Sequence, residues 1–294
     1  MLFDAQLLCG RDDWLARNKP ELAHRLDPAE ASAQLESAAG GERWRAALFP
    51  FPSAPRQAYL SENARVIAAA QAEPRFLAVA AINPQVPENL RAIEEAAEMG
   101  AIAGLAVWPI LCELDLVELQ HEARLWRLAE RYDLPVTVHV GTGAEPDLGR
   151  AVKHNRYTPA DAAELARALP QIRFNLSHCL RLSREALDLV ASLGNVWTDT
   201  SGLSAVGRWR EAGQEVFLAA DALDVGEDPH YVIVRLIRDY GLEGRVMFAS
   251  SFPFSAWWHF DVSAEAHACR RQPLGEDALS ALLWSNACEF YKEI

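Results

Sequence analysis

Short apolar runs alternate with helical segments along the whole 294-residue chain, and this alternation restricts its fold more than any other feature. Eight such runs are typical of buried strands: residues 1–8, 46–51, 76–82, 102–108, 136–140, 172–176, 196–198 and 246–249. No linker-like stretch or internal repeat interrupts them. The pattern therefore predicts one domain over residues 1–294 with the α/β class of fold, a (β/α)8 TIM barrel. A doubly wound open sheet is the alternative, but no G-x-G-x-x-G follows the first run.

Capping residues predict where several of the intervening helices begin. Asp27 precedes Pro28 and a helical pattern that reaches residue 38, and Ser183 precedes one that ends at Gly194. We also expect one long helix over residues 113–132, where apolar residues recur at helical spacing, and a helix over residues 211–222.

Charge and cysteine content exclude several classes of function. The net charge of -13 disfavours binding to nucleic acid or to anionic membranes, both of which rely on clustered Lys and Arg. No apolar run approaches the roughly 20 residues of a membrane span, and the first four residues carry no basic charge, so we expect no signal peptide. Five scattered cysteines without a C-x-x-C pair indicate reduced thiols, and we expect a cytoplasmic protein.

Candidate site residues are those at the carboxyl ends of the strands, because active sites of such barrels lie there. These residues are Gln6, Leu8, Trp108, His139, His178, Asp199, Ser201 and Ser251. A single buried histidine is more often structural than functional. Two histidines at the ends of adjacent strands point instead to a metal site or to acid–base chemistry.

Several motifs, in the order in which they occur, resemble the amidohydrolase superfamily, in its amidohydrolase-related branch of decarboxylases and lactone hydrolases. They are LFDA at 2–5, NARVIAAAQAEPRFLAVAAINP at 63–84, LPVTVH at 134–139, RFNLSH at 173–178, NVWTDTSG at 195–202, GRVMFASSFP at 244–253 and SNA at 285–287. The resemblance runs almost from end to end. It implies a TIM barrel, small-molecule substrates and, because barrels of this family often pair, a possible homodimer.

The departures from that family concern its metal ligands. The resemblance places an H-x-H pair at Gln6 and Leu8, a bridging lysine near Ala106 or Val107, and a metal-binding aspartate at Ser251. Only His139 and His178 match the family's ligands. Two imidazoles are fewer than the three protein ligands of a usual catalytic zinc site. We therefore expect no cofactor, and His139 and His178 are the ligands of any zinc that does bind.

Three functions remain open at this point. The first is a metal-independent hydrolase, decarboxylase or cyclase in which His139 and His178 act as acid and base while Ser251 and Asp199 orient the substrate or water. The second is a non-catalytic barrel that binds a small molecule, a peptide or a partner protein. The third is a metal-dependent hydrolase with substituted ligands. For a small aromatic or peptidic ligand, the expected contacts are Gln6, Leu8, Trp108, Phe254, Trp257 and Trp258.

Overall fold

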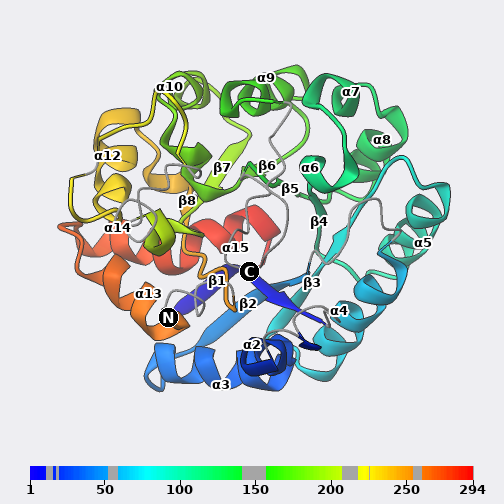
Figure 1. Ribbon diagram of the computed structural model, residues 1–294, viewed down its shortest axis with the longest axis horizontal. Helices are drawn as coiled ribbons and strands as arrows, with labels where there is room; N and C mark the ends of the chain where they lie inside the picture. Colours follow the sequence, from blue (N-terminus) through cyan, green and yellow to red (C-terminus); the bar gives the residue numbers. More distant parts are fainter. Residues whose placement is uncertain are drawn as a thin grey trace.

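Eight parallel strands in sequential order, β1 to β8, form a barrel within a ring of helices (Figure 1). The computed structural model describes residues 1–10, 16–17, 20–51, 59–140, 157–206, 218–224, 226–253 and 260–293. The strands are β1 Leu2–Cys9, β2 Trp44–Pro50, β3 Phe76–Ala81, β4 Gly104–Val107, β5 Val136–Val138, β6 Phe174–Leu176, β7 Val196–Asp199 and β8 Val246–Met247. The predicted TIM barrel is confirmed.

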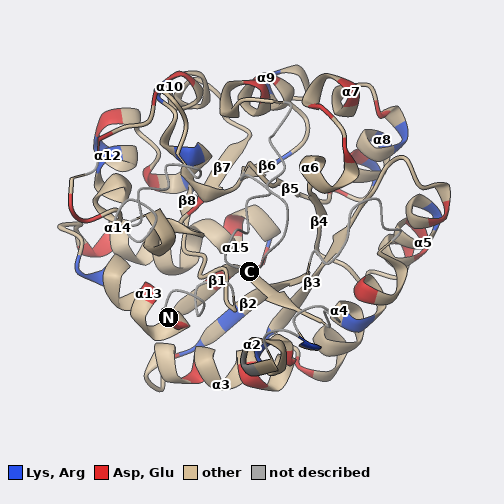
Figure 2. Ribbon diagram, in the orientation of Figure 1, with Lys and Arg blue, Asp and Glu red and all other residues tan. Residues whose placement is uncertain are grey.

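Helices cover the outside of the barrel and carry many of its charged residues (Figure 2). Those in the described residues include α2 Pro20–Ala23, α3 Pro28–Ala39, α4 Leu60–Ala72, α5 Pro87–Glu98, α6 Pro109–Cys112, α7 Leu116–Gln120, α8 Ala123–Arg131, α9 Pro159–Ala168, α10 Arg184–Ala191, α12 Tyr231–Tyr240, α13 Val262–Arg270, α14 Glu276–Ser280 and α15 Asn286–Tyr291. Two predicted caps are confirmed: Asp27 accepts the N–H of Ala29, and Ser183 accepts that of Ala186. No helix in the described ranges is both long enough and apolar enough to cross a bilayer.

The long helix expected over residues 113–132 is wrong, because the chain forms two helices there, α7 and α8. Asp115 and Glu118 form a capping box that starts α7. The indole N–H of Trp126 then donates to the carbonyls of Leu119 and Gln120, at 2.9 and 3.2 Å, where α7 ends. Of the helix expected over 211–222, residues 211–217 lie outside the described ranges, and 218–222 are not helical.

Hydrogen bonds between β1 and the segment that begins with β8 close the barrel. The N–H groups of Ala5 and Leu8 donate to the carbonyls of Phe248 and Phe252 at 2.9 and 2.8 Å. The carboxylate of Asp4, which is fully buried, contacts the Ser250 hydroxyl and accepts the N–H of Ser250 at 3.1 Å. We call this set of contacts the closing seam. Burial raises the pKa of Asp4 to about 7.

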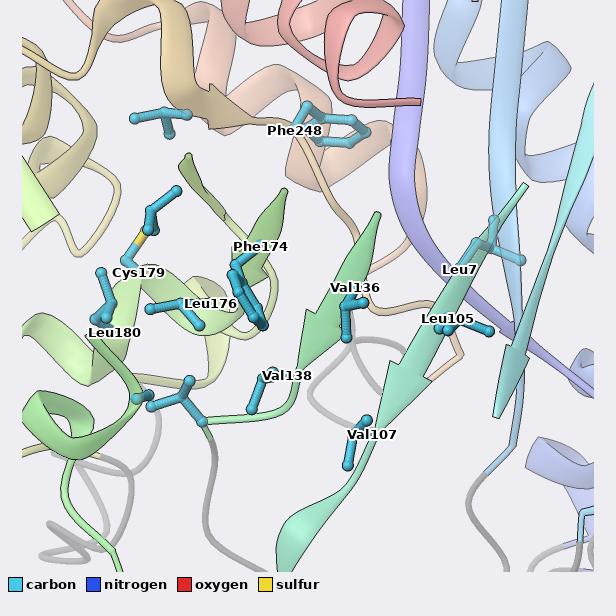
Figure 3. Close-up of a cluster of buried hydrophobic side chains, with 14 of the residues drawn as sticks. Leu7, Leu105, Val107, Val136, Val138, Phe174, Leu176, Cys179, Leu180 and Phe248 are labelled. Carbon is cyan, nitrogen blue, oxygen red and sulfur yellow. The ribbon is translucent and has the colours of Figure 1, made fainter. Parts of the chain in front are cut away.

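Two apolar clusters lie on the two sides of the sheet. The outer one packs strands against helices, and Figure 3 shows part of it, including Val136 and Val138 of β5. The inner one fills the barrel. At the amino ends of the strands, α15 contributes Phe290 and Tyr291 to this inner cluster. The ring of Tyr291 stacks on Phe3 at 5.8 Å, and its hydroxyl donates to the carbonyl of Ala5 at 3.1 Å. Side chains of α15 thus close that end of the barrel.

Candidate functional site

The structure brings His139 and His178 together at the carboxyl ends of β5 and β6. The register pairs Val138 with Leu176, so that the residues that follow these strands are neighbours. The two imidazole rings meet edge to face, with centroids 4.7 Å apart and an interplanar angle of 85°. The backbone of His139 is fixed on both sides: its N–H donates to Val107 O at 2.9 Å, and its carbonyl accepts the Tyr157 hydroxyl at 2.6 Å.

Contacts with Ser201 determine the tautomer of His178. Its Nδ1 lies 2.9 Å from the carbonyl oxygen of Ser201 and 2.7 Å from the Ser201 hydroxyl. A carbonyl oxygen only accepts, so Nδ1 carries the hydrogen. The lone pair of the neutral ring is therefore on Nε2, and this atom is the one that can take up a proton.

Asp199, at the end of β7, supports His178 from below. Its carboxylate accepts the N–H of His178 at 3.1 Å, the N–H of Ser201 at 3.0 Å and the side-chain amide of Asn175 at 2.6 Å, and it also contacts the Ser201 hydroxyl. The side chain is fully buried. Asp199 is thus placed to hold His178 in position, and hydrogen-bond donors of the protein surround both of its carboxylate oxygens.

Burial keeps both imidazoles neutral near pH 7. Desolvation is the main cause that lowers the pKa of His139, with smaller contributions from His178 and Arg181. Desolvation also lowers the pKa of His178, and it outweighs the opposing effect of Asp199. The pair therefore offers proton acceptors, or hydrogen-bond donors through its N–H groups, rather than a positive charge.

The backbone after β6 has an unusual conformation that orients His178. Residues His178 to Leu182 form a left-handed 3-10 turn, with φ angles of 62, 46, 51, 53 and 60°. None of them is glycine, and left-handed conformation costs roughly 1–2 kcal/mol per residue for other side chains. Backbone bonds to the β7–α12 connection offset this cost: Ala219 N–H donates to Arg181 O at 3.0 Å and Leu223 N–H to Leu182 O at 2.8 Å. The sequence analysis missed this turn.

The opposite wall of the barrel is apolar. Leu8 and Trp108 both belong to the inner cluster, and Trp108 packs edge to face on Phe49 with centroids 6.5 Å apart. Tyr59 lies 6.1 Å from the same indole. Strands β1 to β4 thus supply an aromatic wall, whereas β5 to β7 supply the histidines and Asp199. Such a division suits a flat apolar ligand that has a polar reacting group.

Two further predicted residues, Gln6 and Ser251, lie at the closing seam. Ser251 has a φ of 53° and donates its N–H to Gln6 O at 3.1 Å. The Oε1 atom of Gln6 is buried and has no hydrogen-bond partner among the described residues. The same holds for Nδ1 of His139 within that part of the chain. The predicted contacts Phe254, Trp257 and Trp258 lie outside the described residues.

Comparison with known proteins now identifies the class. A family model described as "Amidohydrolase" matches residues 19–292 of the chain. The chain belongs to this amidohydrolase family. Among curated proteins, none matches the chain.

Solved structures with the same fold cover nearly the whole chain at low sequence identity. A putative 2-pyrone-4,6-dicarboxylic acid hydrolase from Pseudomonas putida has a TM-score of 0.66 and 15% identity, and the match covers 100% of this chain and 98% of that one. A 5-carboxyvanillate decarboxylase from Novosphingobium aromaticivorans, complexed with manganese and a nitrobenzoic acid, has a TM-score of 0.67 and 16% identity over 99% and 96%. At these identities the likeness shows the fold.

The manganese in the second of these structures corrects our expectation of no cofactor. A D314N mutant of the Novosphingobium decarboxylase also has bound manganese, so barrels of this fold are found with a metal ion. In the described part of this chain, however, no three His, Cys, Asp or Glu side chains are grouped to hold a metal ion. His139, His178 and the unpaired amide oxygen of Gln6 are donors at these strand ends in the described residues, whereas the carboxylate of Asp199 is already surrounded by hydrogen-bond donors. They do not form a site with three ordinary ligands, and we derive no step through a metal.

Proposed function

We propose that this amidohydrolase is an enzyme that hydrolyses a small planar ester or lactone, with His178 as its general base. The observation that carries the proposal is the fixed tautomer of His178, since Nδ1 donates to Ser201 O at 2.9 Å and leaves the Nε2 lone pair as the proton acceptor. General acid–base catalysis by one positioned imidazole contributes roughly 10²–10⁴-fold to a rate.

In the proposed reaction, Nε2 of His178 takes a proton from a water molecule as the water oxygen attacks the substrate carbonyl. The C–O bond to the leaving oxygen then breaks, and the imidazolium returns the proton to that oxygen. His139, whose ring lies edge to face against His178, donates an N–H to the oxyanion that develops on the carbonyl. Asp199 holds the backbone N–H of His178 at 3.1 Å and keeps the ring in place.

Two further observations support this substrate class. The aromatic wall formed by Trp108, Phe49 and Tyr59 provides apolar surroundings opposite the histidines. The solved structures with this fold include hydrolases of 2-pyrone-4,6-dicarboxylic acid and decarboxylases of 5-carboxyvanillate, and both names describe small planar acids. Decarboxylation of such an acid is therefore the companion reaction to test.

The test is turnover of 2-pyrone-4,6-dicarboxylate, followed by the loss of its ultraviolet absorbance, and of 5-carboxyvanillate, followed by release of carbon dioxide. Protein as purified, after treatment with a chelator and after addition of Mn²⁺ should be compared. We expect His178→Asn to lower kcat by roughly 10²-fold or more. His121→Asn, an exposed position at the end of α7, is the matched control and should retain full activity. A folded His178→Asn protein with unchanged kcat contradicts the proposal.

A non-catalytic binding barrel is the second candidate, and one observation favours it. Ser251 stands where the resemblance places the family's proton-moving aspartate, and it donates its backbone N–H to Gln6 O at 3.1 Å. In that case both acids bind, neither is consumed under any metal condition, and His178→Asn leaves turnover at zero.

A further inference from the structure

We propose that Tyr291, at the amino end of the barrel, is a positioning residue for His178 at the carboxyl end and acts through a chain of buried polar side chains. The inference rests on the proposed function and adds to it the groups that hold Asp199 in its orientation. We call the side chains of Tyr291, Thr137, Asn175 and Asp199 the interior polar chain. Figure 1 shows α15, which carries Tyr291, across the middle of the barrel.

The middle of the chain consists of two side chains that strand geometry places together inside the barrel. The residues on either side of Thr137 and Asn175 belong to the outer cluster, and they are Val136, Val138, Phe174 and Leu176 (Figure 3). Successive side chains of a strand point to opposite faces, so Thr137 and Asn175 point inward. The register of β5 and β6 pairs these two residues directly. The Nδ2 atom of Asn175 lies 3.4 Å from the Thr137 hydroxyl and 2.6 Å from the Asp199 carboxylate.

Tyr291 reaches the same layer from the amino end of the barrel. Burial raises the pKa of its hydroxyl, the charge of Asp199 raises it further, and a hydrogen bond with Thr137 lowers it. A hydrogen bond that lowers the pKa of a phenol stabilises the phenolate, so the Thr137 hydroxyl is the donor. The proton of Tyr291 itself goes to the carbonyl oxygen of Ala5, at 3.1 Å.

These contacts give the chain one direction. A carbonyl oxygen only accepts, so the phenol proton belongs to Ala5 and the proton of Thr137 to the phenol oxygen. The oxygen of Thr137 then offers a lone pair to Asn175, and only the amide nitrogen can meet it. The amide oxygen of Asn175 is buried without a hydrogen-bond partner among the described residues, so contacts of Nδ2 orient the amide.

The chain ends at the support of the proposed base. With its amide nitrogen held by Thr137, Asn175 directs an N–H at Asp199, which in turn accepts the backbone N–H of His178 at 3.1 Å. Without the phenol oxygen, the proton of Thr137 is free to donate to the amide oxygen of Asn175. An amide turned in that way takes the 2.6 Å donor from Asp199. Buried polar networks lose much of their rigidity when one member is unsatisfied, so the place of His178 becomes less well defined.

The first test observes the amide of Asn175 by NMR in full-length protein labelled with ¹⁵N-asparagine, with Asn175→Ala to assign the signal. An N–H that donates to a carboxylate at 2.6 Å should resonate downfield of ordinary side-chain amides. We expect Tyr291→Phe, which keeps the ring, and Thr137→Val, which keeps the shape, to move this signal upfield. Thr137→Ser keeps the hydroxyl and should restore it. Tyr231→Phe, an exposed position on α12, is the matched control and should leave it in place.

The second test measures turnover of the same variants. Tyr291→Phe and Thr137→Val should lower kcat about 3- to 10-fold and leave KM unchanged, because one hydrogen bond of the support is lost and no contact with the substrate. Thr137→Ser and Tyr231→Phe should retain the kcat of the wild type.

Folding of each variant is monitored by circular dichroism, and the Thr137 variants supply the result if Tyr291→Phe does not fold. An Asn175 signal at its wild-type position in folded Tyr291→Phe or Thr137→Val overturns the proposal, as does a Thr137→Ser protein that behaves like Thr137→Val. The NMR readout needs no turnover. A shifted Asn175 signal that Thr137→Ser restores, in a protein that consumes neither acid, therefore sustains the interior polar chain and rejects the proposed hydrolysis.

Discussion

Replacing Asp4 by asparagine should make the stability of the barrel much less dependent on pH. Asp4 is fully buried in the closing seam, where its carboxyl group contacts the Ser250 hydroxyl and accepts the N–H groups of Ser250 and Gln6. An asparagine can keep these contacts, since its oxygen accepts the two N–H groups and its amide donates to the hydroxyl. The substitution removes only the ionisation of the carboxyl group at position 4.

The size of the effect follows from the pKa of Asp4, which burial raises from 3.8 to about 7. A raised pKa means that the folded protein binds the proton more tightly than the unfolded chain. The stabilising contribution is therefore complete below pH 3.8, and it is lost as the pH rises through about 7. At about 1.36 kcal/mol per pKa unit, the loss amounts to roughly 4 kcal/mol. That is a large part of the 5–15 kcal/mol typical of a folded domain.

The assay is urea denaturation of wild type and of Asp4→Asn at pH 4.5, 6, 7 and 8, with the free energy of unfolding compared at each pH. We expect the stability of the variant relative to wild type to rise by several kcal/mol over this range and to level off near pH 8. Asp188→Asn, on the exposed side of α10, changes the net charge equally and serves as the control. Two curves for wild type and Asp4→Asn that stay parallel across the range refute the reasoning.

Three further predictions concern the site and its support. Burial and, to a smaller extent, Arg181 lower the pKa of His178, so the acid limb of the kcat/KM profile of the wild type should lie below pH 6.5. Arg181→Gln should move this limb to higher pH. An acid limb at the same pH in both proteins argues against the Nε2 atom as the base. Asn175→Ala removes the 2.6 Å hydrogen bond to Asp199 and should cost about 1–3 kcal/mol in urea denaturation together with a lower kcat; full activity means that Asp199 does not depend on it. Phe290→Ala empties part of the inner cluster beside Trp197 and should cost about 3–5 kcal/mol, whereas a loss below 1 kcal/mol shows that α15 does not close the barrel.

The fold was predictable because buried parallel strands appear in the sequence as short apolar runs. The residues at which the strands end were harder to predict. The strand expected over residues 246–249 is regular only at Val246–Met247. Beyond it, Phe248 N–H donates to Leu282 O, and the Thr200 hydroxyl bridges both the N–H and the carbonyl of Ala249. Hydrogen bonds to side chains and to distant backbone groups leave no pattern in the neighbouring residues. Hydrophobic periodicity therefore did not predict that the regular strand ends at Met247.

At the site, the sequence indicated the histidine pair but not the contacts that govern it. His139 lies near the end of one apolar run and His178 comes two residues after the next, which placed them at adjacent strand ends before their 4.7 Å ring separation was known. The left-handed turn contains no glycine, so its conformation and the place of Arg181 on it were not predicted from the sequence. Asp4 was one residue within an apolar strand, and only its burial against Ser250 shows its importance.

The closing seam also determines when the barrel can close during synthesis of the chain. Asp4 and Ser250 are separated by 246 positions in the chain. At typical synthesis rates of roughly 5–20 residues per second, the amino-terminal strand waits on the order of 10–50 s before its last neighbour leaves the ribosome. Throughout that interval one edge of β1, including the buried carboxylate, has no partner strand. The growing chain therefore presents an open sheet edge of the kind that chaperones protect, and the closing seam can form only after residue 250 has been added.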